Sequence, residues 1–369
     1  MVQVIPHSVL MTTDTIGGVW SYALSLSAGL AKRGVHVALA TLGPPPSPGQ
    51  REQIARLHDV LLFEGAYSLE WMDAPWSEVD ASGRWVLELE AQLRPSLCHF
   101  NTYAHAALPT RAPRLVVGHS CVLSWWQETL GESPPQRYSE YAARVRSGLQ
   151  HAGAVVAPSA AMLRMLERHY RPLPHACVIP NGVALEHWSP GRKRPQIAAA
   201  GRVWDAGKNL QALAQVASQL HWPVFVAGQS ASGSQPGGAP SWHALGHVPQ
   251  ARLQQLLAET SIFVHPARYE PFGLAPLEAA ACGCALVLGD IPSLREVWDD
   301  AALYAKPDDP EHLKFQIRRL EDDSRLRDAY AAKARAQAQK YPLARSVAGY
   351  LSLYEQLLAG TRQAQAHSH

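Results

Sequence analysis

The stretch VHPARYEPFGLAPLEAAACGCALVLGD, residues 264–290, decides the fold. It carries two carboxylates, Glu270 and Glu278, with seven residues between them. The Pro-Phe-Gly that follows Glu270 disfavours helix, because proline restricts the residue before it and glycine is a poor helix former. We therefore expect a turn that leads into a helix beginning near Leu274 and capped by Gly283. Glu270 then lies on a loop and Glu278 on the helix.

Short apolar strands flank this unit, at residues 261–264 and 285–288. Strand, helix, strand is the βαβ pattern of a parallel sheet, and such sheets bind ligands at the carboxyl ends of their strands. Glu270 comes just after such an end. Three backbone N–H groups form the N-terminus of the expected helix, where they can hold hydroxyl or phosphate oxygens: those of Phe272, Gly273 and Leu274.

Length and composition limit the class of protein. At 369 residues the chain exceeds the size at which single cores usually stop growing, so we expect two domains. A net charge of +2 gives no reason to expect nucleic acid as a partner. The first lysine is Lys32 and no apolar run approaches the ~20 residues of a membrane span, so we expect neither a signal peptide nor a transmembrane segment. The five scattered cysteines indicate buried thiols in a reducing cytoplasm.

A first βαβ unit opens the chain. Apolar residues 9–11 lead through a loop to a helical pattern over 19–33, and a second strand covers 35–40. Gly17 and Gly18 stand where this helix begins, so backbone there can approach a ligand closely. A Gly-Gly pair alone is more often only a turn.

Another apolar strand, residues 115–118, ends at His119, whose imidazole would point to the edge where chemistry occurs. A lone histidine is more often a core residue with a satisfied hydrogen bond. Trp125 and Trp126 follow on a loop at the same end, as packing residues, membrane-surface anchors or, less often, a sugar-stacking pair. Polar residues on a neighbouring loop could hydrogen-bond an acceptor: His99, Asn101, Tyr103 and His105.

The segment 186–195, EHWSPGRKRP, is basic and broken by prolines, and we expect it to link the domains with its cations on a solvated face. The strand pattern restarts at residues 197–201. Arg202 and Lys208 bracket one strand-to-helix turn, so both cations can reach a single point above the sheet.

With these residues assembled, the sequence resembles a known family. YEPFGLAPLE is similar to the signature of retaining nucleotide-sugar glycosyltransferases of family 4, which have the GT-B fold of two facing Rossmann-like doubly wound sheets. Gly-Arg at 201–202 and Lys-Asn at 208–209 match the diphosphate clamp of that family. The resemblance implies three parts: an acceptor-binding domain, a donor-binding domain, and a C-terminal helix that packs back on the first domain and ends in a disordered tail from Gly360. Their expected ranges are 1–185, 186–345 and 346–369.

The resemblance also implies roles for the side chains. Arg202 and Lys208 would stabilise the departing diphosphate without a metal. Glu278 would accept hydrogen bonds from the ribose hydroxyls, and Glu270 would hold a sugar hydroxyl or stabilise developing positive charge. His119 would lie near the transferred sugar. The remaining expected donor contacts are Gly17, Gly18, Val248, Phe272, Gly273 and Leu274.

The expected activity is the retaining, front-face transfer of a hexosyl group from a nucleoside-diphosphate sugar to a hydroxyl acceptor, which is a glycan, a lipid or a small metabolite. Neither a cofactor nor a metal is expected, and a peripheral membrane contact stays open. Two alternatives remain: a nucleotide-sugar epimerase of the same fold, and a non-catalytic sugar-nucleotide-binding protein. An NAD-type enzyme is disfavoured, because no complete Gly-x-Gly-x-x-Gly follows the first strand.

Overall fold

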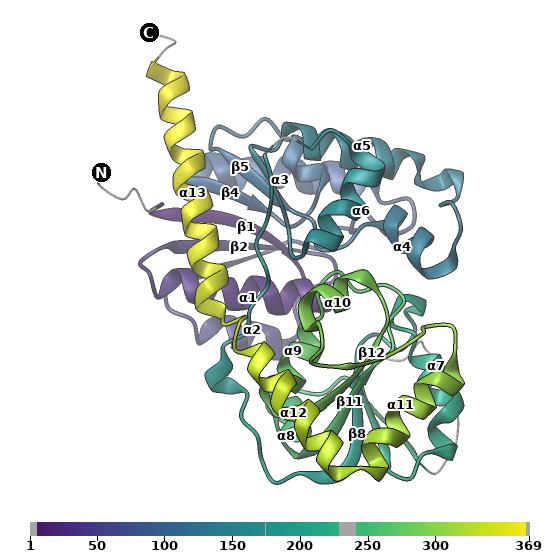
Figure 1. Ribbon diagram of the computed structural model, residues 1–369. Coiled ribbons are helices and arrows are strands. Elements are labelled where there is room, and N and C mark those ends of the chain that lie inside the picture. The colour runs from purple at the N-terminus through teal and green to yellow at the C-terminus, as the bar shows by residue number, and fades with distance from the viewer. Residues whose placement is uncertain (1–5, 174, 229–240, 367–369) are drawn as a thin grey trace. The chain divides into compact units, whose positions relative to one another are not determined.

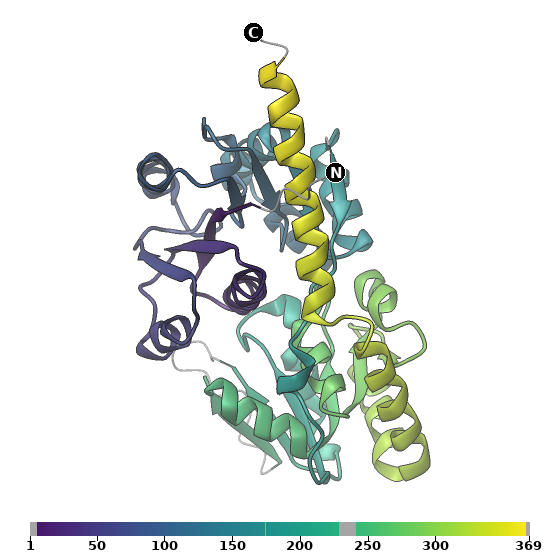
Figure 2. The same ribbon diagram turned by 90° about the vertical axis from the view of Figure 1, so that its left-hand side faces the viewer.

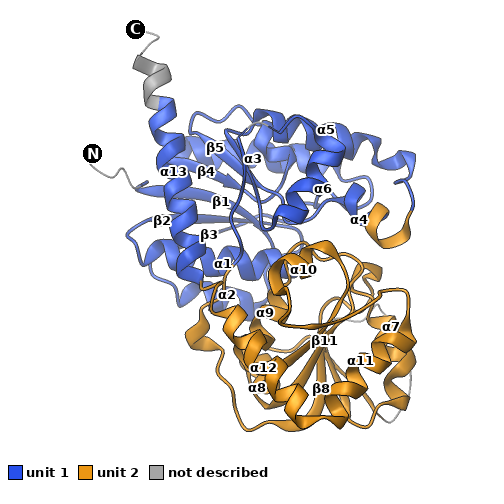
Figure 3. Ribbon diagram, viewed as in Figure 1, with its two compact units in different colours: residues 1–126, 132–181, 343–369 blue, residues 127–131, 182–342 orange. Residues whose placement is uncertain are grey.

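The protein forms two parallel α/β units (Figures 1 and 2). The computed structural model describes residues 6–173, 175–228 and 241–366. Unit 1 comprises residues 1–126, 132–181 and 343–369, and unit 2 comprises residues 127–131 and 182–342 (Figure 3). The fold class expected from the sequence, α/β with two Rossmann-like sheets, is confirmed.

Unit 1 contains a sheet of strand order β3-β2-β1-β4-β5-β6-β7, and every pairing between its described strands is parallel. The strands are β1 Ser8–Asp14, β2 His36–Leu42, β3 Val60–Glu64, β4 Leu97–Phe100, β5 Arg114–Val117, β6 Ala154–Ala157 and β7 Ala176–Val178. The helices are α1 Gly18–Ala31, α2 Pro48–Ala55, α3 Trp76–Leu93, α5 Ser139–His151, α6 Ala160–Tyr170 and α13 Leu343–Ala366, with short 3₁₀ turns η1 Ala104–Ala107 and η2 Gln136–Tyr138. Helix α4, Val122–Leu130, is divided between the units.

Unit 2 contains a parallel sheet of order β10-β9-β8-β11-β12-β13. Its strands are β8 Arg194–Ala200, β9 Val224–Ala227, β10 Trp242–Gly246, β11 Thr260–His265, β12 Ala285–Gly289 and β13 Leu303–Ala305. Its helices are α7 Leu210–Val216, α8 Gln250–Glu259, α9 Leu274–Ala281, α10 Pro292–Trp298, α11 Pro310–Asp322 and α12 Ser324–Ala338. Three 3₁₀ turns complete the described elements of this unit: η3 Leu185–His187, η4 Ala206–Lys208 and η5 Ala217–Gln219.

In both sheets the chain order reverses at the centre, between β1 and β4 in unit 1 and between β8 and β11 in unit 2. Because right-handed crossovers on the two sides of such a point lie on opposite faces, the loops that follow the two central strands diverge and leave a crevice at their carboxyl ends. The fold therefore offers one ligand site per unit.

The strands of unit 2 read as continuous apolar runs because both faces of the sheet are covered. Successive residues alternate between two buried clusters: Ala198 and Phe263 pack in one, while Ile197 and Ile262 pack in the other. All six residues of β11 are buried. The loop that follows β11 thus begins at a residue whose position is set by packing on both faces of the sheet.

The helix expected near Leu274 is confirmed. Helix α9 spans Leu274–Ala281 after Gly273, whose φ of 95° is in the left-handed region, and Gly283 follows it with φ of 77°. Glycine occupies both positions because a Cβ is strained at such φ values.

Three local expectations are wrong. Trp125 and Trp126 lie within helix α4 instead of on a loop. The expected linker ends early, because β8 already begins at Arg194. Lys193 is not solvated: its Nζ donates to the main-chain oxygens of Leu257, Thr260 and Cys282 at 3.2, 2.8 and 2.7 Å.

Helix α13 continues to Ala366, past Gly360, where we expected disorder to begin. Helix α13 belongs to unit 1 and contacts α1 there.

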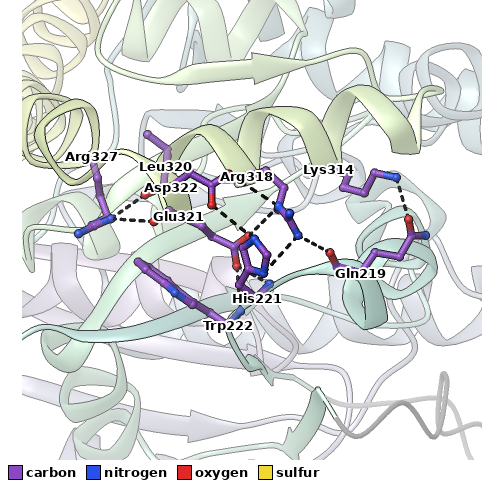
Figure 4. Close-up of polar contacts among 9 residues, drawn as sticks. All are labelled: Gln219, His221, Trp222, Lys314, Arg318, Leu320, Glu321, Asp322 and Arg327. Atoms are coloured by element: carbon purple, nitrogen blue, oxygen red, sulfur yellow. Dashed lines mark hydrogen bonds and ion pairs between the residues drawn. The ribbon is translucent and has the colours of Figure 1, made fainter.

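A polar cluster fastens α11 to the loop before β9 (Figure 4). The buried carboxylate of Glu321 accepts hydrogen bonds from the main-chain N–H groups of His221 and Trp222, at 3.0 and 2.9 Å. Arg318 donates to the main-chain oxygen of Gln219 at 2.9 Å. The cluster is remote in sequence from the expected site residues and serves packing, because its bonds satisfy backbone groups that the loop leaves unpaired.

The carboxyl ends of β8 and β9 approach so closely that Gly228, with φ of 149°, leaves no room for a side chain. A Cβ there would lie 1.7 Å from the main-chain oxygen of Gly201. We predict that Gly228→Ala destabilises unit 2 by at least ~2 kcal/mol, seen as a lower thermal midpoint. Gly360→Ala is the control, because nothing lies within 4 Å of its added Cβ. Equal midpoints for the two variants would contradict this description of the strand ends.

Candidate active site

Two loops meet at the switch point of unit 2. One runs from the end of β8 through η4 to α7, and the other runs from the end of β11 to α9. The main-chain N–H groups of Arg268 and Tyr269 both donate to the oxygen of Gly207, at 2.9 and 3.1 Å. Backbone hydrogen bonds therefore set the spacing of the loops, independently of any charged side chain.

Asn209 completes this junction. It adopts φ of 55°, which asparagine tolerates better than most residues, and its Nδ2 donates to the main-chain oxygens of Pro266 and Pro307 at 2.9 and 2.8 Å. The Arg268 guanidinium donates to Asn209 Oδ1 at 2.6 Å. The start of α7 is thus bound to the loop after β11, and Lys208 is held beside it.

An ion pair crosses between the loops. Lys208 Nζ lies 2.6 Å from Glu270 Oε2, and the two side chains are 18% and 12% exposed. Burial by itself would raise the pKa of Glu270, but the Lys208 ammonium and the His265 imidazole hold that pKa well below its ordinary value. Glu270 is therefore ionised across the working range of pH.

His265, the last residue of β11, was not among the predicted site residues. Its Nε2 lies 2.9 Å from Glu270 Oε2, and its side chain is 2% exposed. Because an ionised carboxylate only accepts, Nε2 of His265 donates to Glu270, while Nδ1 is buried without a partner among the described residues. Its position at a central strand end, directly before the glutamate loop, is the signal that could have identified it.

Arg202 lies on the turn after β8. Its Nη2 is 2.6 Å from Asp205 Oδ2, and its guanidinium lies 5.3 Å from the centre of the Trp204 ring. Asp205 also accepts from the main-chain N–H of Gly207 at 2.9 Å. The structure therefore brings Lys208 to Glu270. It places Arg202 on the same turn as Lys208, in contact with Asp205. Asp205 is another residue that sequence reasoning missed.

Glu278 is the fifth residue of α9 and is half-buried. In the part of the chain that the structure describes, no hydrogen bond reaches its carboxyl group. Burial raises the pKa of Glu278 to about 8. At neutral pH the carboxyl group is therefore protonated, because burial favours the uncharged form.

The remaining predicted donor contacts lie around these two glutamates. Phe272 is buried with its ring 5.5 Å from that of Tyr341, and its N–H lies 3.5 Å from Glu270 Oε1. Ser293, on α10, donates to the main-chain oxygen of Glu270. Gly273 and Leu274 form the N-terminus of α9. Val248 is half-buried between β10 and α8, where it packs against the core of unit 2.

In unit 1 the predicted residues lie at the carboxyl ends of β1 and β5. Gly17 is the N-cap of α1, with φ of 75°, and a Cβ on Gly18 would meet nothing within 4 Å. His119 follows β5, with its Nε2 2.8 Å from Asn101 Oδ1. Burial lowers the pKa of His119 to about 3, so its ring is neutral.

Three of the four candidate acceptor contacts are buried structural groups. His99 lies within β4, the Oη of Tyr103 donates to the main-chain oxygen of Ser120 at 2.8 Å, and His105 lies 2.9 Å from Ser82 Oγ. Only Asn101 remains half-buried at the strand end.

Two kinds of site are absent from residues 6–173, 175–228 and 241–366. No helix there is long and apolar enough to cross a membrane. Those same ranges hold no group of three or more His, Cys, Asp or Glu side chains arranged to bind a metal ion.

Comparison with known proteins agrees with this geometry. Residues 16–187 match the family model described as Glycosyltransferase Family 4, and residues 206–337 match the model described as Glycosyl transferases group 1. O-antigen chain mannosyltransferase B of Escherichia coli is 42% identical over 98 residues, 26% of this chain and 26% of that protein. The match thus spans about a quarter of the length of that relative.

Solved structures share the fold. Sucrose-phosphate synthase of Thermosynechococcus elongatus superposes with a TM-score of 0.84 at 18% identity, covering 96% of this chain and 100% of that one. Anabaena HepE in complex with UDP and glucose gives a TM-score of 0.72 at 15% identity, covering 97% of this chain and 100% of that one.

Two Rossmann-like parallel sheets and similarity to these structures show that the chain has the GT-B fold. With its two halves matched by the two domain models, the chain belongs to the family-4 type of glycosyltransferase.

The raised pKa of Glu278 generates a prediction about stability. Between its ordinary pKa of 4.5 and the folded value of about 8, the unfolded chain has lost this proton while the folded chain keeps it. The free energy of unfolding therefore falls as pH rises through this window. We expect Glu278→Gln to raise the thermal midpoint, relative to the original chain, by roughly 2–5 °C at pH 8.5 and by much less at pH 5.

Thermal unfolding at both pH values measures this difference. Glu311→Gln is the matched control, because the Glu311 side chain is 70% exposed. A gain in midpoint that is the same at both pH values would contradict the assignment of a protonated Glu278.

Proposed function

We propose that this protein transfers a hexosyl group from a nucleoside-diphosphate sugar to a hydroxyl acceptor, with retention of configuration and without a metal. The observation that carries the proposal is the contact of Lys208 and His265 with Glu270 at the switch point of unit 2. Charged groups of both signs meet there beside the N-terminus of α9. A sugar diphosphate calls for both signs, because its diphosphate is negative and its sugar becomes positive as the bond breaks.

Breaking the sugar–phosphate bond leaves a diphosphate with additional negative charge and a sugar with oxocarbenium character. Groups that bind this charge more strongly in the transition state than in the ground state accelerate the step. The Arg202 guanidinium offers a planar fork for two oxygens, and the Lys208 ammonium offers a compact charge. These cations, with the N–H groups at the start of α9, can carry the developing charge in place of a metal.

Glu270 supports the front-face route. Its Oε2 is occupied by Lys208 and His265, while its Oε1 makes only a 3.5 Å contact with the N–H of Phe272. Oε1 is thus available to accept from a sugar hydroxyl. A carboxylate with a lowered pKa and one oxygen shared by two donors is a weak nucleophile, which favours departure and attack on one face over a covalent intermediate.

Glu278 would hold the nucleoside ribose. Its half-buried carboxyl group has acceptor and donor capacity that the described protein groups leave unused. Two ribose hydroxyls supply both the missing donors and an acceptor. Gly17, Gly18 and Val248 would complete the donor contacts through backbone and apolar surface.

The named relatives guide the choice of donors and acceptors. One is an O-antigen chain mannosyltransferase, and HepE was solved with UDP and glucose. We therefore propose a hexose donor, with nucleoside-diphosphate mannose and UDP-glucose first in any panel, and a glycan hydroxyl as the acceptor.

Incubation with a donor panel, with no acceptor present, tests the reaction class. Slow release of nucleoside diphosphate and free sugar supports a transferase, and a rate unchanged by a chelator supports metal independence. An epimerised donor would favour the epimerase alternative. Binding without turnover, across the panel and with added glycan acceptors, would contradict the enzyme assignment.

The two cations give a sharper prediction. We expect Arg202→Ala and Lys208→Ala each to lower the turnover of donor by ~10²-fold or more, because each removes charge stabilisation at the departing diphosphate. Lys314→Ala is the control: this lysine pairs with Glu311 on α11, so turnover should stay near the original. Near-normal rates for both Arg202 and Lys208 variants would show that the charge is stabilised elsewhere.

A further inference from the structure

Three adjacent strands of unit 1 end in one chain of hydrogen bonds. β1, β4 and β5 lie side by side: Thr12 lies in β1, Asn101 directly follows β4, and His119 lies two residues after β5. The main-chain N–H of Asn101 donates to Thr12 Oγ1 at 3.0 Å, and Asn101 Nδ2 donates to the main-chain oxygen of Thr12 at 2.7 Å. Asn101 Oδ1 lies 2.8 Å from His119 Nε2. The side-chain amide of Asn101 is therefore held through both its Nδ2 and its Oδ1.

Only one arrangement of protons satisfies these hydrogen bonds among Thr12, Asn101 and His119. A main-chain oxygen only accepts, so the amide NH₂ of Asn101 faces Thr12 and its Oδ1 faces His119. An amide oxygen also only accepts, so Nε2 of His119 must carry a proton. No hydrogen bond to Nδ1 of His119 is found among the described residues. A neutral ring in this place is consequently the Nε2–H tautomer, with a free lone pair on Nδ1.

The groups packed against the ring keep it neutral. Tyr22, from α1, meets the His119 ring edge to face with centroids 4.4 Å apart. His99, from β4, is hydrogen-bonded to Tyr22 and to Tyr354 of α13, and burial lowers the pKa of His99 to about 3. Burial likewise holds the pKa of Tyr22 above its ordinary value. None of these neighbours carries a charge at neutral pH that would stabilise an imidazolium.

We infer that Asn101 is a positioning residue that locks His119 in its neutral Nε2–H tautomer, so that His119 recognises a substrate hydroxyl as a hydrogen-bond acceptor through Nδ1. The inference deepens the proposed function, since it rests on His119 facing the sugar. It also names the chemical group that is selected. A lone pair accepts from an O–H, whereas an ionised phosphate oxygen has no proton to give. Unit 1 thus selects a hydroxyl at this point.

NMR spectroscopy of the full chain with ¹⁵N-labelled histidine reads the tautomer directly, and the signal that is missing in His119→Gln identifies His119. We expect the Nε2–H form with no titration between pH 5 and pH 8. In Asn101→Ala the ring should become a mixture of tautomers. In Asn101→Asp a carboxylate takes the place of the amide, so the ring should become protonated near neutral pH. The protonated fraction at pH 6 should rise severalfold.

Thr12→Val is the matched control. It removes Oγ1, which accepts from the main-chain N–H of Asn101, but it keeps the main-chain oxygen that binds the Asn101 amide. Thermal unfolding should register a loss of stability at this junction while the tautomer of His119 stays the same. An Nδ1–H ring or a ring that titrates in the original chain would overturn the inference. So would an Asn101→Ala variant with an unchanged ring.

Donor hydrolysis separates the two proposals. We expect Asn101→Ala to lower turnover roughly ten-fold, and Asn101→Asp to lose activity further as pH falls below 7, because an imidazolium donates where an acceptor is needed. If the NMR result holds but the original chain hydrolyses no donor, the proposed function fails and the tautomer lock stands. If the original chain hydrolyses donor and Asn101→Ala keeps its full rate, the positioning role fails alone.

Discussion

The ion pair between Lys208 and Glu270 is the interaction on which the site in unit 2 depends. It joins the turn after β8 to the loop after β11, the two loops that diverge at the switch point of the sheet. Both groups are largely buried, so neither can lose its partner without leaving an uncompensated charge in a poorly solvated place. Backbone hydrogen bonds set the spacing of the two loops, and the pair then fixes the Lys208 and Glu270 side chains against each other within that frame.

The two units share an architecture, but their strand ends carry charged groups in unit 2 and neutral groups in unit 1. In unit 2 the strand ends carry the cations Arg202 and Lys208, which pair with the carboxylates of Asp205 and Glu270. In unit 1 the corresponding strand ends carry Asn101 and a neutral His119, which suit hydroxyl groups. The same crevice of a doubly wound sheet is thus lined by charged groups in one unit and by neutral hydrogen-bonding groups in the other.

The sequence predicted the parallel sheets and the start of α9 because proline, glycine and apolar runs act locally. It also predicted that Glu270 lies on a loop and Glu278 on a helix, because the proline and glycine between them disfavour helix before Leu274. It missed the burial of Lys193, because the three main-chain oxygens that bind it come from residues 64 to 89 positions away. His265 and Asp205 were missed although their partners, Glu270 and Arg202, lie only five and three residues away. The pairing of Arg202 with Asp205 could not be read from spacing alone, which shows only that two side chains can meet.

A double-mutant cycle between Lys208 and Glu270 tests most directly whether the pair acts as one catalytic unit. Donor turnover would be measured for the original chain, for Lys208→Met, for Glu270→Gln and for the double variant. The account predicts that the double variant loses no more activity than the worse single variant, which corresponds to a coupling free energy of more than ~1 kcal/mol. Losses that simply multiply, with no coupling between the two positions, would contradict it.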